Sequence, residues 1–121
     1  MSDITTVILA AGNSTRFKAS KSKLVYPLCG LPIVSHIFNI AKKISGKNIL
    51  IVCNDKNKEE LKLILNTSKL VVQKKQKGTA DAIEQVKKYV RSKNILILFG
   101  DTPLVEVKDI KKLVSKFKLS K

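Results

Sequence analysis

The stretch that decides the fold is ITTVILAAGNSTRF, residues 4–17. Residues 4–10 are apolar or β-branched, which is typical of a strand buried on both faces of a parallel sheet. From Ala11 to about Lys23 the chain turns to Gly, Ser, Thr and Lys. A turn of small residues after a buried strand lets backbone N–H groups converge on phosphate oxygens. The stretch has neither Walker nor dinucleotide-fingerprint spacing, so taken alone it also fits an ordinary strand-to-helix loop.

The rest of the chain alternates short aliphatic runs with amphipathic segments, which indicates a parallel sheet flanked by helices. Further strands are expected at residues 48–53, 70–72 and 95–99, the last being the strongest apolar run. Helices are expected from Pro32 to about residue 44, over 57–65, from a cap at Thr79 to about residue 90, and over about 110–117. The side chains expected to turn the third helix toward the core are Ala82, Ile83, Val86, Tyr89 and Val90. We therefore expect a Rossmann-like three-layer α/β/α fold with a mostly parallel sheet.

Length and composition fit one domain with an aliphatic core: 121 residues, 44% hydrophobic and 5% aromatic. No apolar run is long enough to span a bilayer, and residues 1–6 lack the features of a signal peptide, so we expect a cytoplasmic protein. Cys29 and Cys53 lie far apart and outside any C-x-x-C pair. They are interpreted as core thiols of a reducing compartment, with no disulfide framework or zinc site.

The formal net charge of +15 comes from 24 basic residues, of which 22 are Lys and two are Arg. Proteins that read nucleic-acid bases depend strongly on Arg, and these lysines are scattered along the whole chain. Solvated helix surfaces are therefore the favoured interpretation, while a polyanion-binding role stays open. In either case the charge attracts an anionic ligand such as a nucleotide.

Two more loops follow the ends of expected strands, where open α/β sheets place their ligands. In QKKQKGTADA, residues 73–82, Gln73 carries both a donor and an acceptor for a pyrimidine edge. Gly78 permits close approach of the backbone, and Thr79 offers a hydroxyl at the start of a helix. A solvated polar turn is the alternative interpretation of this segment.

In FGDTPL, residues 99–104, Asp101 follows what we expect to be a buried strand. A carboxylate there is a suitable oxygen ligand for Mg²⁺, although a helix-capping aspartate would look the same. Arg16 and Lys23, in the first loop, would add fixed positive charge for a triphosphate and for departing pyrophosphate.

Five ordered motifs together resemble one family. They are LAAGxxTRF at 9–17, SKL at 22–24, GLPIVxH at 30–36, QxxQxGTAxA at 73–82 and FGDTPL at 99–104. The first three resemble sugar-phosphate nucleotidyltransferases, which have the nucleotide-diphospho-sugar transferase fold. The last two narrow the resemblance to the bacterial N-acetylglucosamine-1-phosphate uridylyltransferase domain, and the similarity covers residues 7 to about 113.

The resemblance implies an in-line attack by the phosphate of N-acetylglucosamine 1-phosphate on the α-phosphorus of UTP. The products are pyrophosphate and UDP-N-acetylglucosamine, a precursor of peptidoglycan and lipopolysaccharide. It implies that Arg16 and Lys23 contact the triphosphate and the transition state, and that Asp101 binds Mg²⁺. The residues that it assigns to the nucleoside are Leu9, Ala10, Ala11 and Gly12 beside the base and ribose, and Gln73 on the uracil, with Gly78 and Thr79 next to it.

The resemblance also implies that these residues are the nucleotide-binding half of the domain. The acceptor-sugar half and a β-helix acetyltransferase domain, through which the family forms oligomers, would be absent. Three positions differ from the family's usual residues: Ser14 replaces glycine, Ser22 replaces proline and Asp81 replaces histidine. Two alternatives stay open, a truncated nucleotide-binding module without catalysis and a cytidylyl- or guanylyltransferase of the same superfamily. Neither a specific nucleic-acid partner nor membrane insertion is expected.

Overall fold

The computed structural model describes residues 4–11, 27–28, 30–67, 69–74, 78–100 and 107–119. Its central sheet has four parallel strands in the order β5-β4-β1-β6. They are β1 (Ile4–Leu9), β4 (Ile49–Cys53), β5 (Leu70–Val72) and β6 (Asn94–Phe99). The helices are α1 (Ile33–Ser45), α2 (Lys58–Leu65), α3 (Thr79–Lys87) and α4 (Val107–Leu119). Before α1, β2 (Pro27–Leu28) and β3 (Leu31–Pro32) form a short antiparallel hairpin that the sequence did not predict.

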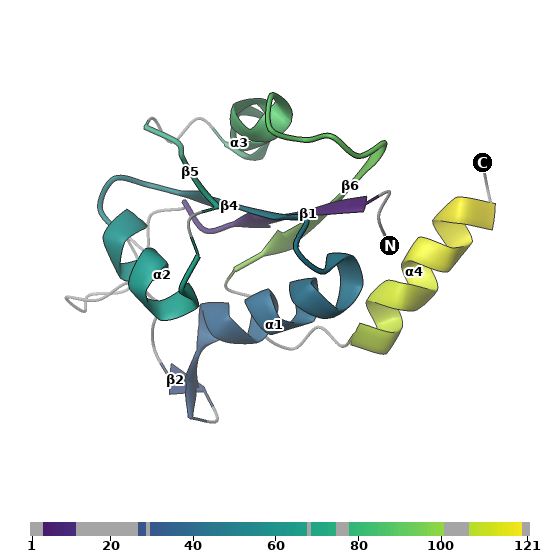
Figure 1. Ribbon diagram of the computed structural model, residues 1–121, viewed down its shortest axis with the longest axis horizontal. Coiled ribbons are helices and arrows are strands. Elements are labelled where there is room, and N and C mark those ends of the chain that lie inside the picture. Colours follow the sequence, from purple (N-terminus) through teal and green to yellow (C-terminus); the bar gives the residue numbers. More distant parts are fainter. Residues whose placement is uncertain are drawn as a thin grey trace.

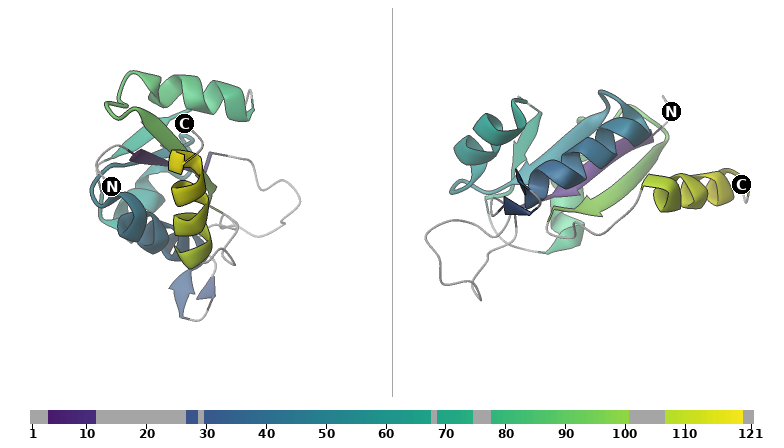
Figure 2. Two further views of the ribbon diagram at one scale, coloured as in Figure 1. Left: turned by 90° about the vertical axis from the view of Figure 1, so that its right-hand side faces the viewer. Right: turned by 90° about the horizontal axis from the view of Figure 1, so that it is seen from below.

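The helices cover both faces of the sheet, which confirms the three-layer α/β/α expectation (Figure 1). One face packs against α3, whereas α1 lies across the other, with α2 and α4 on either side of it (Figure 2). Neighbouring side chains of β1 alternate between the two cores: Ile8 packs in the α1 core and Val7 in the α3 core. Because both faces are buried, every residue of β1 is apolar or β-branched, as its sequence indicated.

A polar link ties the carboxyl end of α1 to the first strand. The hydroxyls of Thr6 and Ser45 are hydrogen bonded at 2.8 Å, and both side chains are buried. Ser45 also donates to the carbonyl of Asn48, just before β4, at 2.9 Å. These bonds satisfy polar groups that would otherwise be costly to bury, and they fix where α1 ends relative to the sheet.

Three predictions made from the sequence were wrong. Tyr89 does not face the core but is 51% exposed, because α3 already ends at Lys87. The cap of α3 is Gly78 rather than Thr79, which is the first helical residue. The run 95–99 is a strand, but β6 lies at the edge of the described sheet, with Ile95 and Phe99 40% and 48% exposed. An edge strand has a neighbour on one side only, so part of its apolar surface stays uncovered.

None of the helices in the described part of the chain combines the length and apolar character that a bilayer crossing requires.

Candidate functional site

The carboxyl ends of the four parallel strands meet at one rim of the sheet. Ala10 follows β1, Asn54 follows β4, Gln73 follows β5 and Gly100 follows β6. The chain adds β4 and β5 on one side of β1 and then crosses, through α3, to place β6 on the other side. This reversal is the point at which open α/β sheets bind ligands. With neighbouring strands about 5 Å apart, the rim extends about 14 Å from β5 to β6.

The backbone at the end of β1 is tightly held. The N–H of Ala10 donates to Val52 at 2.8 Å, and the carbonyl of Leu9 accepts from the N–H of Gly100 at 3.0 Å. Ala10 and Ala11 are both buried. The structure therefore brings the first-loop residues predicted to line the nucleoside, Leu9 to Ala11, next to the residue that immediately precedes Asp101.

Two asparagines after β4 hold the same backbone from the other side, and the sequence reasoning missed them. Asn57 donates through Nδ2 to the carbonyl of Ala10 at 2.8 Å, and Asn54 donates through Nδ2 to the carbonyl of Ala11 at 3.0 Å. Each side-chain oxygen also accepts the other's backbone N–H, at 2.8 and 2.9 Å. The available signal was an Asn-x-x-Asn spacing between a strand and a helix, where such side chains often bond to the backbone.

Gln73 stands at the rim directly after β5, as predicted, and it is 4% exposed. Its backbone N–H donates to the carbonyl of Cys53 at 2.8 Å, so it continues the sheet pairing by one residue. Its side-chain Nε2 donates to the carbonyl of Gly78 at 3.2 Å and to Oδ2 of Asp81 at 2.8 Å. The structure thus joins Gln73 to the start of α3, two segments that the sequence had assigned to one site.

The backbone conformation at position 78 requires glycine. Its φ of +94° and ψ of −179° lie in a region that essentially only glycine adopts. A Cβ at this position would meet no described atom within 4 Å, so there is open space beside it. Thr79, next along the chain, is exposed. The predicted approach of a base to Gly78 stays a prediction.

The remaining predicted residues, Gly12, Arg16, Lys23 and Asp101, lie outside the described residues, as do Ser14 and Ser22. Within the described ranges there is no group of three or more His, Cys, Asp or Glu side chains that could hold a metal ion.

Cys53 ends β4 just below the rim, and it is a core thiol rather than a nucleophile. The side chain is fully buried, and its Sγ lies 3.7 Å from the carbonyl of Val71. Burial raises the pKa of Cys53 to about 11, and the positive charge of Lys58 opposes this only in part. Because the thiolate is the reactive form, the thiol is inert near neutral pH. Cys53 is therefore a core residue, as predicted, whereas Cys29 lies outside the described residues.

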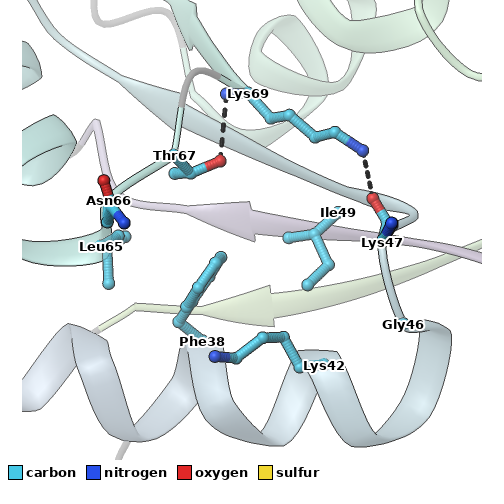
Figure 3. Close-up of a pocket in the computed structure, with 9 residues that line it drawn as sticks. All are labelled: Phe38, Lys42, Gly46, Lys47, Ile49, Leu65, Asn66, Thr67 and Lys69. Carbon is cyan, nitrogen blue, oxygen red and sulfur yellow. Dashed lines mark hydrogen bonds between the residues drawn. The ribbon is translucent and has the colours of Figure 1, made fainter.

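A pocket of about 400 Å³ lies at the opposite edge of the sheet (Figure 3). Its wall contains Ile49, the first residue of β4, and Lys69, the residue before β5, so it opens at the amino ends of these strands. Lys42 lies in the last turn of α1, and its Nζ is 5.0 Å from the centre of the Phe38 ring. Lysines in this position complement the negative end of the helix dipole, which accounts for them without a ligand. The pocket is therefore separate from the rim that carries Gln73.

Comparison with known sequences gives consistent results. Residues 6–121 match the family described as MobA-like NTP transferase domain. The chain is 43% identical over 120 residues to the bifunctional protein GlmU of Buchnera aphidicola subsp. Schizaphis graminum, covering 98% of this chain and 26% of that protein. It is 41% identical over 118 residues to the bifunctional protein GlmU of Campylobacter fetus, covering 93% and 27%. The chain therefore spans about a quarter of the length of these curated relatives.

Solved structures share the fold. A putative glucose-1-phosphate thymidylyltransferase from Bacillus anthracis superposes with a TM-score of 0.86 at 21% identity, covering 98% of this chain and 51% of that one. A CMP:2-keto-3-deoxy-manno-octonic acid synthetase complexed with CTP gives a TM-score of 0.79 at 20% identity, covering 97% and 48%. These likenesses confirm the expected nucleotide-diphospho-sugar transferase architecture.

Proposed function

This chain belongs to the MobA-like NTP transferase domain family, and from that premise we propose that it binds UTP at the carboxyl rim of its sheet for transfer to N-acetylglucosamine 1-phosphate. Nucleotidyl transfer is the chemistry of the family, so the chain is an enzyme domain by descent. The nucleotide and the sugar are our proposal, supported by the five motifs and by relatives named GlmU. Because the chain spans about a quarter of those relatives, we propose that it supplies the nucleotide-binding part.

The observation that carries this proposal is the place and bonding of Gln73. Its side chain is held at the rim beside the open space next to Gly78, on the same edge of the sheet as the buried backbone of Ala10. The amide of Gln73 at one end of the rim and the backbone of Ala10 at the switch point lie on the edge where open α/β sheets bind ligands, which supports a nucleotide bound there. We propose that Leu9 to Gly12 contact the nucleoside and that Gln73, with Gly78 and Thr79 beside it, contacts the uracil.

In this reaction the protein has to align the attacking phosphate with the α-phosphorus and neutralise the negative charge of the phosphates. The attacking phosphate is already anionic, so it needs no general base and no covalent enzyme intermediate. We propose that Arg16 and Lys23 stabilise the charge that develops on the α-phosphorus and the departing pyrophosphate.

Asp101 follows Gly100, whose N–H bonds to the end of β1, so the metal ligand that we propose stands in sequence next to the switch point. A carboxylate oxygen is the donor that Mg²⁺ prefers. Bound there, the ion would neutralise phosphate charge.

The test is a titration of the chain with UTP, CTP and GTP in the presence of Mg²⁺, by calorimetry. We expect UTP to bind most tightly and Gln73→Met to weaken it by about tenfold, the effect of one ordinary hydrogen bond. Methionine has a similar length but no amide, and Asn39→Ala, an exposed amide on α1, serves as the control. Equal binding of all three nucleotides, or tighter binding of CTP or GTP, would contradict the proposal.

Pyrophosphate release with N-acetylglucosamine 1-phosphate then separates catalysis from binding. Release dependent on the sugar phosphate supports an active transferase, whereas UTP binding without release favours a nucleotide-binding module.

A further inference from the structure

The amide of Gln73 has only one chemically allowed orientation. The two groups that its Nε2 contacts are the carbonyl of Gly78 at 3.2 Å and the carboxylate of Asp81 at 2.8 Å. Both groups accept hydrogen bonds and neither donates. A flipped amide would place its oxygen against two other oxygens, in a side chain that is 4% exposed. The two hydrogens of Nε2 are therefore used inside the protein, and Oε1 lies at the other end of the amide.

We propose that Asp81 is a positioning residue that fixes this orientation, so that Gln73 offers a base an acceptor and not a donor. This role rests on the proposed function, in which Gln73 contacts the base. A fixed acceptor that faces position 3 of the base pairs with the N–H of uracil, whereas N3 of cytosine is itself an acceptor and the donor of cytosine lies on the neighbouring 4-amino group. Asp81 would thus determine the preference for UTP over CTP without touching the nucleotide.

Asp81 is itself held in place. It lies in the first turn of α3, where a carboxylate is favoured by the helix dipole, and its side chain is half-buried. Its other oxygen, Oδ1, lies 3.5 Å from Nε2 of Gln85. A carboxylate with this setting could also serve only to stabilise the helix start, so a test needs a readout that helix stability does not change. The ratio of UTP to CTP affinity is such a readout, because a change in overall charge or stability affects both nucleotides equally.

Calorimetric titration with each nucleotide and Mg²⁺ tests the role. We expect Asp81→Ala to lower the UTP:CTP affinity ratio by about tenfold, because the freed amide can then turn its nitrogen toward a cytosine. Asp81→Asn retains an oxygen that can accept from Gln73, and it should keep most of the preference. Glu84→Ala removes the same charge from an exposed position of the same helix and should leave the ratio unchanged. If Asp81→Ala does not fold, Asp81→Leu, which keeps the size of this half-buried side chain but removes both acceptor oxygens, replaces it.

The dependence on Gln73 is tested by a double-mutant cycle. If Asp81 acts through Gln73, Asp81→Ala should not change the ratio further once Gln73 is methionine. An unchanged ratio in Asp81→Ala, or an equal change in the Gln73→Met background, overturns the role of Asp81 while UTP binding and the proposed function stand. If the wild-type chain does not bind UTP, or binds it with no preference that Gln73→Met removes, the proposed function is wrong and the role of Asp81 falls with it.

Discussion

Replacing Asn57 with alanine should destabilise the chain by about 3–5 kcal/mol. The side chain is 6% exposed and makes two hydrogen bonds, from its Nδ2 to the carbonyl of Ala10 at 2.8 Å and from the N–H of Asn54 to its Oδ1 at 2.9 Å. Each bond contributes about 1 kcal/mol net, and a buried carbonyl left without a donor costs about 1–3 kcal/mol more. The expected loss is large because the bond to Ala10 joins the end of β1 to the start of α2, 47 residues apart in the sequence.

Urea unfolding followed by far-ultraviolet circular dichroism measures this loss. The midpoint should fall while the slope with urea stays the same, since the native surface does not change. Asn57→Asp is the sharper variant, because it keeps the size and the acceptor but removes the donor to Ala10 and sets a carboxylate against a carbonyl. Asn39→Ala, at an exposed position of α1, should change stability by no more than about 0.5 kcal/mol. If Asn57→Ala stays as stable as that control, or Asn57→Asp as stable as wild type, the link does not hold β1 as described.

Three more predictions concern Cys53, Gly78 and Lys23. Burial raises the pKa of Cys53 from 9.0 to about 11, so the stabilising contribution of the neutral thiol is complete below about pH 9 and is lost as the pH rises through 11. The difference in unfolding free energy between wild type and Cys53→Ala should therefore shrink over that range. A constant difference would show that the thiol is not desolvated. Gly78→Ala should lower the free energy of unfolding by about 1–3 kcal/mol, measured by thermal unfolding. The cause is backbone strain and not a clash, since φ of Gly78 is +94° and no described atom lies within 4 Å of the new Cβ. An unchanged melting temperature would mean that the loop adopts another conformation at no cost. Lys23→Ala, made in a longer protein that carries the whole transferase domain, should lower turnover by about tenfold or more with little change in stability, and an unchanged rate of pyrophosphate release would remove Lys23 from the mechanism.

Local sequence patterns determined the elements of this protein. The run of apolar and β-branched residues in β1 predicted a strand covered on both faces, and Val7 and Ile8 indeed pack in two different cores. Helical spacing likewise predicted α1, α2 and α3 to within a few residues, and the position of Gln73 directly after a strand placed it at the carboxyl rim of the sheet. These features are readable because burial and helical periodicity are set within a few neighbouring residues.

Only the tertiary structure decided which elements and side chains meet. The apolar run at 95–99 predicted a strand, but not that it lies at the sheet edge beside β1 with Phe99 partly exposed, because backbone pairing between strands carries no residue code. The sequence marked Asp81 only as a departure from the family's usual histidine, whereas in the structure its carboxylate lies 2.8 Å from the amide of Gln73. The sequence placed Asn57 at the start of an expected helix, but it did not show that the amide bonds to the carbonyl of Ala10. A polar side chain bonds to whichever group the fold brings within about 3 Å of it, and in a parallel sheet that group comes from a distant segment of the chain.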